Sequence, residues 1–89
     1  MKYFEWSPEK NEKLISERNI SFQEVVEALN EGNLITIRKN PQKKYKNQKI
    51  FVITIKNYVY VVPFIEDSTT IFLKTIYPSR KYTKQYLKK

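Results

Sequence analysis

The hydrophobic pattern of this chain changes once, at its single glycine, Gly32. Before Gly32, apolar side chains recur at helical spacing, as Phe22, Val25, Val26 and Leu29 do. After it come short alternating or β-branched runs separated by turn residues, a pattern typical of strands. The helices are therefore expected first and the strands second, and this segregation favours an α+β fold over an alternating parallel one.

The sequence before the glycine contains two helix starts. Ser7 is a good N-cap and Pro8 suits the first helical position, so a helix is predicted over 8–18. Ser21 and Glu24 have the spacing of a capping box, which predicts a second helix that the glycine ends. The apolar stripe of this second helix predicts that one of its faces is buried.

Four strands are predicted beyond the glycine, over residues 34–39, 49–56, 58–65 and 70–77. Their short connections favour antiparallel pairing in chain order. Pro63 cannot donate to a strand ladder, so it marks a bulge, an edge or a strand end. Ser79 is predicted to cap a short helix that runs to Lys88. The expected fold is α+β: two N-terminal helices packed on a four-stranded antiparallel sheet, with a short C-terminal helix.

Two missing residue types exclude several kinds of active site. The chain has no cysteine, which excludes thiol catalysis and zinc-thiolate sites, and no histidine, which excludes an imidazole base. Its 89 residues predict one domain over 1–89. No apolar run approaches the ~20 residues of a membrane span, and the N-terminus lacks the apolar core of a signal peptide, so a cytoplasmic protein is expected.

The charge is distributed unevenly along the chain. Residues 1–32 hold four Lys/Arg and seven Glu, for a net charge of −3. Residues 33–89 hold 13 Lys/Arg and two acids, Glu66 and Asp67, for a net charge of +11. A positive field of this size attracts polyanions such as nucleic acid. The alternative is a lysine-rich surface that serves only solubility. The two acids are interpreted as a turn, and no metal or other cofactor is predicted.

The C-terminal segment holds the main candidate residues. From Pro78 onward it contains five Lys/Arg, two tyrosines and no acid. On a helix, Tyr82 and Tyr86 share one face and Arg80 and Lys84 share the neighbouring one. Arginine forks onto phosphate, while tyrosine stacks on bases or donates its hydroxyl. The segment therefore predicts a nucleic-acid site, unless it is a solvated tail whose tyrosines pack on the sheet.

A second basic group lies in the connection between the first two predicted strands. Residues 38–49 contain six Lys/Arg and no acid, which suits a loop that clamps a nucleic-acid backbone. A hairpin that only protects a sheet edge from aggregation is an equally good explanation. The residues predicted to bind RNA are Arg38, Lys43, Lys44, Lys46, Lys74 and Lys81.

Three segments together resemble a known family. They are Phe4-Glu5-Trp6-Ser7-Pro8-Glu9-Lys10-Asn11, Ile20-Ser21-Phe22-Gln23-Glu24-Val25 and Ile76-Tyr77-Pro78-Ser79-Arg80-Lys81-Tyr82-Thr83-Lys84. In this order and at this length they resemble the BrnT family of bacterial toxins, within the RelE/ParE-like superfamily. The resemblance implies a ribonuclease that blocks translation. It also implies a partner, a DNA-binding antitoxin encoded beside the toxin gene.

The resulting hypothesis is the toxin of a type II toxin–antitoxin pair, acting as a metal-independent endoribonuclease. Arg80 is expected to contact the phosphate or the transition state. Lys74, Lys81 and Lys84 are expected to add positive field. Tyr82 or Tyr86 would stack on a base or donate a proton. The alternative is a non-catalytic basic module that binds nucleic acid or an antitoxin.

Overall fold

The computed structural model describes residues 2–40, 44 and 48–87. The chain begins with a short strand, β1 (Tyr3–Glu5), and continues into the first helix, α1 (Pro8–Arg18). The Ser7 hydroxyl accepts the backbone N–H of Lys10 at 3.2 Å, which confirms the predicted N-cap. Asn19 ends the helix in the left-handed conformation, at φ 56°.

The second helix, α2 (Phe22–Asn30), begins with the predicted capping box. Ser21 accepts the backbone N–H of Glu24 at 3.2 Å, and the Glu24 carboxylate accepts the backbone N–H of Ser21 at 3.1 Å. Gly32 then adopts φ +81°, a conformation that side chains with a Cβ rarely take. The change from helix to strand therefore occurs at the glycine, as predicted.

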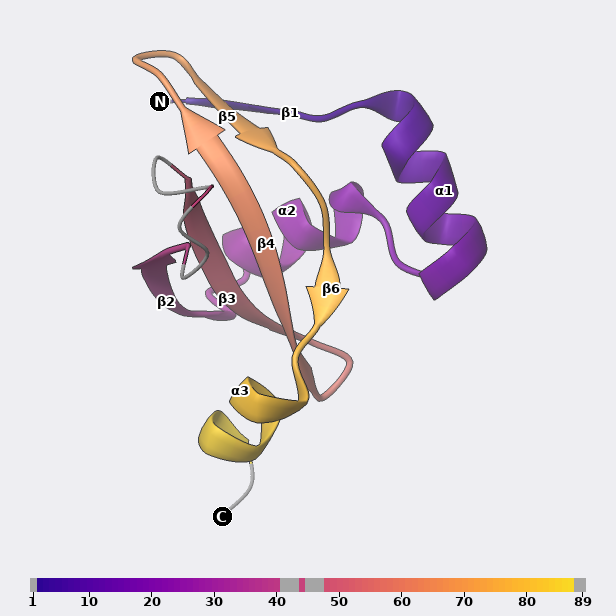
Figure 1. The fold of residues 1–89 in the computed structure, drawn as a ribbon, viewed down its shortest axis with the longest axis vertical. Coiled ribbons are helices and arrows are strands. Elements are labelled where there is room, and N and C mark those ends of the chain that lie inside the picture. Colours follow the sequence, from indigo (N-terminus) through magenta and orange to yellow (C-terminus); the bar gives the residue numbers. More distant parts are fainter. Residues whose placement is uncertain (1, 41–43, 45–47, 88–89) are drawn as a thin grey trace.

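The sheet differs from the predicted one. Five further strands follow α2: β2 (Leu34–Lys39), β3 (Lys49–Ile55), β4 (Tyr58–Glu66), β5 (Thr70–Leu73) and β6 (Tyr77–Pro78). With β1 they form a six-stranded mixed sheet in the order β1-β5-β4-β3-β2, in which β6 also pairs with β4 (Figure 1). The fold is α+β, but the predicted four-stranded antiparallel sheet is wrong, because β1 pairs with β5 in parallel.

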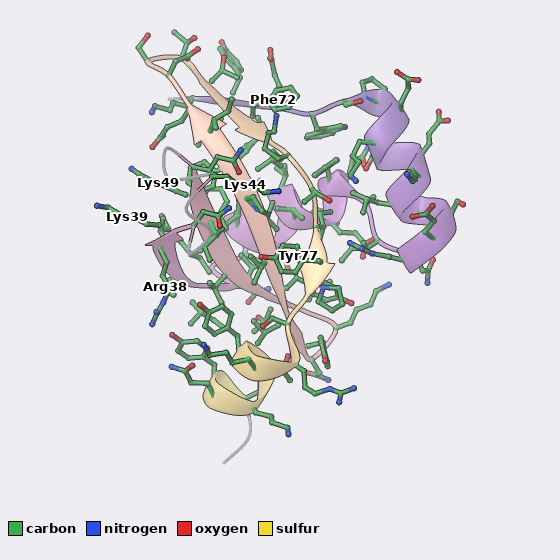
Figure 2. The ribbon with its side chains drawn as sticks, in the orientation of Figure 1. Arg38, Lys39, Lys44, Lys49, Phe72 and Tyr77 are labelled. Atoms are coloured by element: carbon green, nitrogen blue, oxygen red, sulfur yellow. The ribbon has the colours of Figure 1, made fainter. Side chains whose placement is uncertain are left out.

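Pro63 explains why one predicted strand became two. Between the pairs Phe64–Leu73 and Val61–Tyr77, β4 has two residues and its partner has three, which is a β-bulge. The Pro63 carbonyl accepts the backbone N–H of Lys74 at 2.8 Å on that side. A backbone N–H at residue 63 would also point toward the segment that contains Lys74. Because proline has no N–H, the pairing of β4 with this segment is interrupted at Pro63. Phe72 and Tyr77 are labelled on either side of the break in Figure 2.

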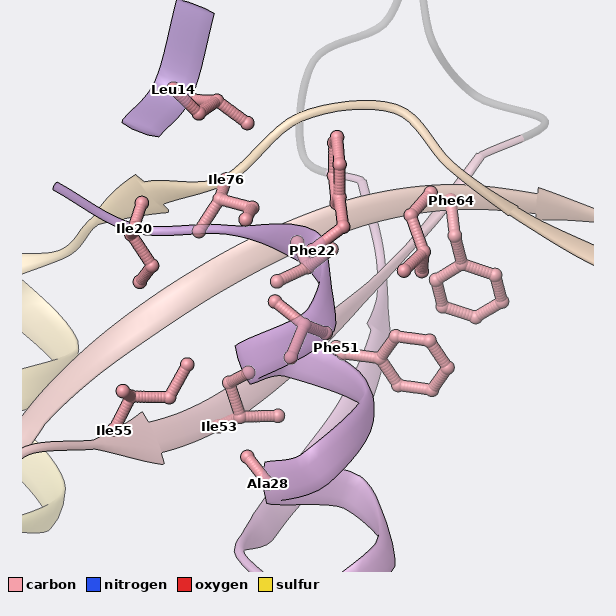
Figure 3. Close-up of a cluster of buried hydrophobic side chains, with 12 residues drawn as sticks. Leu14, Ile20, Phe22, Ala28, Phe51, Ile53, Ile55, Phe64 and Ile76 are labelled. Carbon is pink, nitrogen blue, oxygen red and sulfur yellow. The ribbon is translucent and has the colours of Figure 1, made fainter. Parts of the chain in front are cut away.

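Helix α2 covers one face of the sheet and α1 lies beside it, and side chains of both helices enclose the larger core (Figure 1). Phe22 is fully buried and stacks on Trp6, with ring centroids 5.6 Å apart. Phe51 and Phe64 stack beneath α2 at 4.0 Å. Figure 3 shows how the side chains of this cluster converge on the sheet. Its buried members are Leu14, Ile20, Phe22, Val25, Ala28, Phe51, Ile53, Ile55, Val62, Phe64, Leu73 and Ile76.

A buried asparagine joins the two helices. Asn11 is 7% exposed, and its side-chain oxygen accepts the backbone N–H of Phe22 at 2.8 Å. Its amide nitrogen donates to the Gln23 side-chain oxygen at 3.0 Å. Asn11 therefore satisfies one of the free N–H groups at the start of α2 while holding α1 beside it.

No helix in the described part of the chain is long and apolar enough to cross a membrane.

Glu66 of β4 forms ion pairs with lysines from two other segments of the chain. Its carboxylate contacts the Lys2 ammonium at 2.6 Å and the Lys49 ammonium at 3.3 Å. Hydrogen bonds from Lys2 and then Lys49 lower the pKa of Glu66. The charged carboxylate therefore stabilises the folded protein at pH values above the pKa of glutamate in the unfolded chain, about 4.3. This stabilisation is lost as the pH falls through the lower pKa that Glu66 has in the folded protein.

We therefore expect Glu66→Gln to lower the melting temperature at pH 7 and to have less effect as the pH falls below about 4. Thermal melts of both proteins from pH 7 to pH 3 measure the difference. An equal difference at both ends of this range would show that the two lysines do not stabilise the charged form.

Candidate nucleic-acid interface

The short C-terminal helix, α3 (Arg80–Tyr86), lies on the sheet face opposite α1 and α2 (Figure 1). Two hydrogen bonds fix it to β4. Ser79 donates its backbone N–H to the Val59 carbonyl at 2.9 Å, and the Thr83 hydroxyl accepts the backbone N–H of Val59 at 3.0 Å. The same hydroxyl donates to the Ser79 carbonyl at 2.7 Å, the bond that a helical threonine makes to the residue four before it.

The predicted cap of this helix is confirmed. The Ser79 hydroxyl accepts the backbone N–H of Tyr82 at 3.1 Å. The described helix ends at Tyr86, with Leu87 as its C-cap, and its predicted end, Lys88, lies outside the described residues.

An apolar patch beneath α3 orients its two tyrosines. Tyr82 and Tyr86 are half-buried, with ring centroids 5.9 Å apart. They pack against four buried residues of the central strands, Ile50, Val52, Val59 and Val61. The aromatic rings are thus held against the sheet on one side, where packing limits their rotation.

Arg38, which lies in the edge strand β2, contacts both of these tyrosines. Its guanidinium donates to the Tyr86 hydroxyl at 3.2 Å and lies 5.7 Å from the centroid of the Tyr82 ring. The Lys81 ammonium lies 5.8 Å from the same ring. The hydrogen bond that Arg38 donates to the Tyr86 hydroxyl raises the pKa of the guanidinium above its ordinary value. We call Arg38, Lys81, Tyr82 and Tyr86 the arginine–tyrosine cluster.

A bulge in β2 contributes to the position of Arg38. The register between β2 and β3 shifts between Leu34 and Thr36. Beyond the shift, Arg38 is paired with Ile50, which faces α3. Without the extra residue, the side chain of Arg38 would lie on the other face of the sheet, because a shift of one residue reverses every side chain.

Sequence reasoning missed one member of this face, Tyr77. It is half-buried in β6, packs on the same apolar patch, and is labelled in Figure 2. Burial raises the pKa of its hydroxyl, with a smaller contribution from Tyr82. The sequence predicted Tyr77 only as the last residue of a strand. Its position beside Tyr82 could have been predicted only by choosing the bulge among the three interpretations of Pro63.

The remaining predicted residues lie outside the cluster. Arg80 and Lys84 are exposed, and a helix turns by about 200° over two residues, so both point away from the side that holds Tyr82. Lys74 is exposed after β5, with its ammonium 5.4 Å from the centroid of the Phe72 ring. Lys44 is exposed in the connection between β2 and β3. The two other predicted lysines, Lys43 and Lys46, lie outside the described residues.

The acidic residues lie elsewhere on the molecule. A groove of about 370 Å³ beside α2 is lined by Glu24, Glu27 and Glu31, which would repel a polyanion. Asp67 accepts the backbone N–H groups of Thr69 and Thr70, both at 2.9 Å, and these bonds lower its pKa. This geometry confirms the predicted turn. Among the described residues, no group of three or more carboxylates is arranged to hold a metal ion.

Comparison with known proteins supports the fold. No family model and no curated protein matches the sequence. The structure is similar to the crystal structure of YafQ from E. coli strain BL21(DE3), with a TM-score of 0.52 and 11% sequence identity. The match covers 92% of this chain and 98% of the YafQ chain. At this identity the similarity shows the fold alone, and membership in the BrnT family stays a prediction.

Proposed function

We propose that this protein is the toxin of a type II toxin–antitoxin pair and that RNA is its substrate. The fold is that of YafQ, a RelE-family toxin. The observation that carries the proposal is the arginine–tyrosine cluster, in which the Arg38 guanidinium lies 3.2 Å from the Tyr86 hydroxyl and 5.7 Å from the Tyr82 ring. An arginine fork beside aromatic rings is suited to a phosphate and its neighbouring base.

The proposed reaction is endonucleolytic cleavage by the ribose 2′-hydroxyl. The 2′-hydroxyl gives up its proton to solvent water as its oxygen bonds to phosphorus, and the 5′-oxygen takes up a proton as its own bond to phosphorus breaks, which leaves a 2′,3′-cyclic phosphate and a free 5′-hydroxyl. Arg38 would stabilise the extra negative charge on the phosphate, and Tyr86 would supply the proton to the leaving oxygen. Tyr82 would stack on a base. In this scheme Lys81 and Lys84 add positive field, as the sequence suggested, whereas Arg80, which the sequence favoured as the transition-state contact, guides a flanking phosphate.

We also propose an antitoxin as the protein partner. The basic half of the chain carries a net charge of +11, which favours a partner with an acidic segment.

The proposal is tested by incubating purified protein with RNA in EDTA. Cleavage in EDTA supports a metal-independent endoribonuclease. RNA binding without cleavage, with an affinity that falls steeply as salt increases, supports the non-catalytic alternative. Neither cleavage nor binding of free RNA, by protein that is folded by circular dichroism, would contradict a nuclease that acts on free RNA. The assay would then be repeated with translating ribosomes.

A further inference from the structure

β2 is an edge strand of the sheet. β2 is the last strand of the sheet, and no described strand lies beyond it. Asn40 donates its backbone N–H to the Gln48 carbonyl at 3.0 Å, toward the β3 side. Because successive strand residues turn their peptide groups to opposite sides, Ile37 and Lys39 present theirs to the outer edge. This edge therefore has backbone donors and acceptors that a further strand can use.

The side chains along this edge are apolar and basic. Leu34 is 37% exposed and Ile37 is 48% exposed, both on the sheet face that α2 covers. Arg38 and Lys39 are exposed at the end of the strand. Residues 33–65 contain no aspartate or glutamate, so nothing within this stretch neutralises their charge.

We propose that the outer edge of β2 is a docking site for an extended acidic segment of a partner protein, which adds to the sheet as a further strand. Backbone hydrogen bonds supply affinity in this mode, and alternate side chains supply specificity. Acidic residues would face Arg38 on one side of the added strand, while apolar residues would cover Leu34 and Ile37 on the other. A second copy of this chain fits less well, because its net charge of +8 and its basic edge repel an identical partner.

This inference does not depend on ribonuclease activity, because backbone pairing along β2 needs no catalysis, although Arg38 belongs both to this edge and to the arginine–tyrosine cluster. It is tested with an eight-residue fluorescein-labelled peptide that alternates glutamate and valine, and with a control peptide in which lysine replaces glutamate. We expect the glutamate peptide to bind at least about tenfold more tightly by fluorescence anisotropy. It should also slow hydrogen exchange at the amides of Ile37 and Lys39, measured by NMR on the wild-type protein.

A matched pair of variants separates backbone pairing from charge attraction. Ile37→Pro removes one outward N–H without removing a bond to β3, and Ile37→Ala removes the same side chain but keeps the N–H. We expect the proline variant to lose about tenfold in affinity beyond the alanine variant. Equal affinities, or shifts confined to α3, would overturn edge pairing in favour of simple charge attraction. Dimerisation of the protein through β2 at assay concentrations would overturn the choice of occupant.

Discussion

Replacing Arg38 with alanine is expected to lower the rate of RNA cleavage by about 10²–10³-fold, the usual cost of removing one donor that stabilises developing charge. The physical reason is the position of the guanidinium, which Tyr86 and Tyr82 hold at one end of a packed aromatic surface. Binding should weaken far less than cleavage, because several other cations attract the RNA. Single-turnover cleavage and an RNA-binding titration, on the same preparations, measure the two effects.

Three further variants make this result interpretable. Arg38→Lys keeps the charge but loses the fork, so it should stay well below the wild-type rate. Lys39→Ala removes the adjacent exposed cation, whose side chain points to the other sheet face, and should be close to wild type. Arg80→Ala tests the residue that the sequence favoured. If Arg80→Ala abolishes cleavage and Arg38→Ala does not, the proposed role of Arg38 is wrong.

Replacing Phe22 with alanine is expected to destabilise the protein by about 3–5 kcal/mol, a large part of the 5–15 kcal/mol that holds a typical small domain. Phe22 is fully buried, and it stacks on Trp6 at 5.6 Å. It also begins α2, where Asn11 accepts its backbone N–H. The truncation would therefore leave a cavity where both helices meet the sheet. Urea unfolding, followed by circular dichroism, gives the change in free energy.

Ile15→Ala is the matched control for Phe22→Ala. Ile15 lies on the neighbouring helix α1 and is 48% exposed, so its truncation removes little buried area and should cost less than about 1 kcal/mol. Similar losses in the two variants would mean that Phe22 is not central to the core.

The two N-terminal helices were predictable because their signals are local. The Ser21–Glu24 capping box and the conformation of Gly32 depend on neighbours within a few residues, and the structure has both where the sequence placed them. The Ser79 cap of α3 was predictable for the same reason.

The edges of the sheet were not predictable in the same way. β1 is three residues long, too short for a recognisable alternation, and it becomes a strand only because β5 offers it a parallel edge. The bulge opposite Pro63 was one of three readings open for that residue. Whether Pro63 forms a bulge, lies at an edge or ends a strand depends on which neighbouring strand its missing N–H would face. That side is fixed by the pairing of β4 with strands that are distant in the sequence.

For the candidate site, the sequence alone determined the chemical types: cations, tyrosines and no imidazole or thiol. It also placed Tyr82 and Tyr86 on one helical face. The tertiary structure decided which cation joins them. Arg38 lies 48 residues before Tyr86, and sheet register and the β2 bulge bring the two together. Helical spacing turns the much nearer Arg80 away, because local periodicity sets the faces of a helix while long-range packing chooses what each face meets.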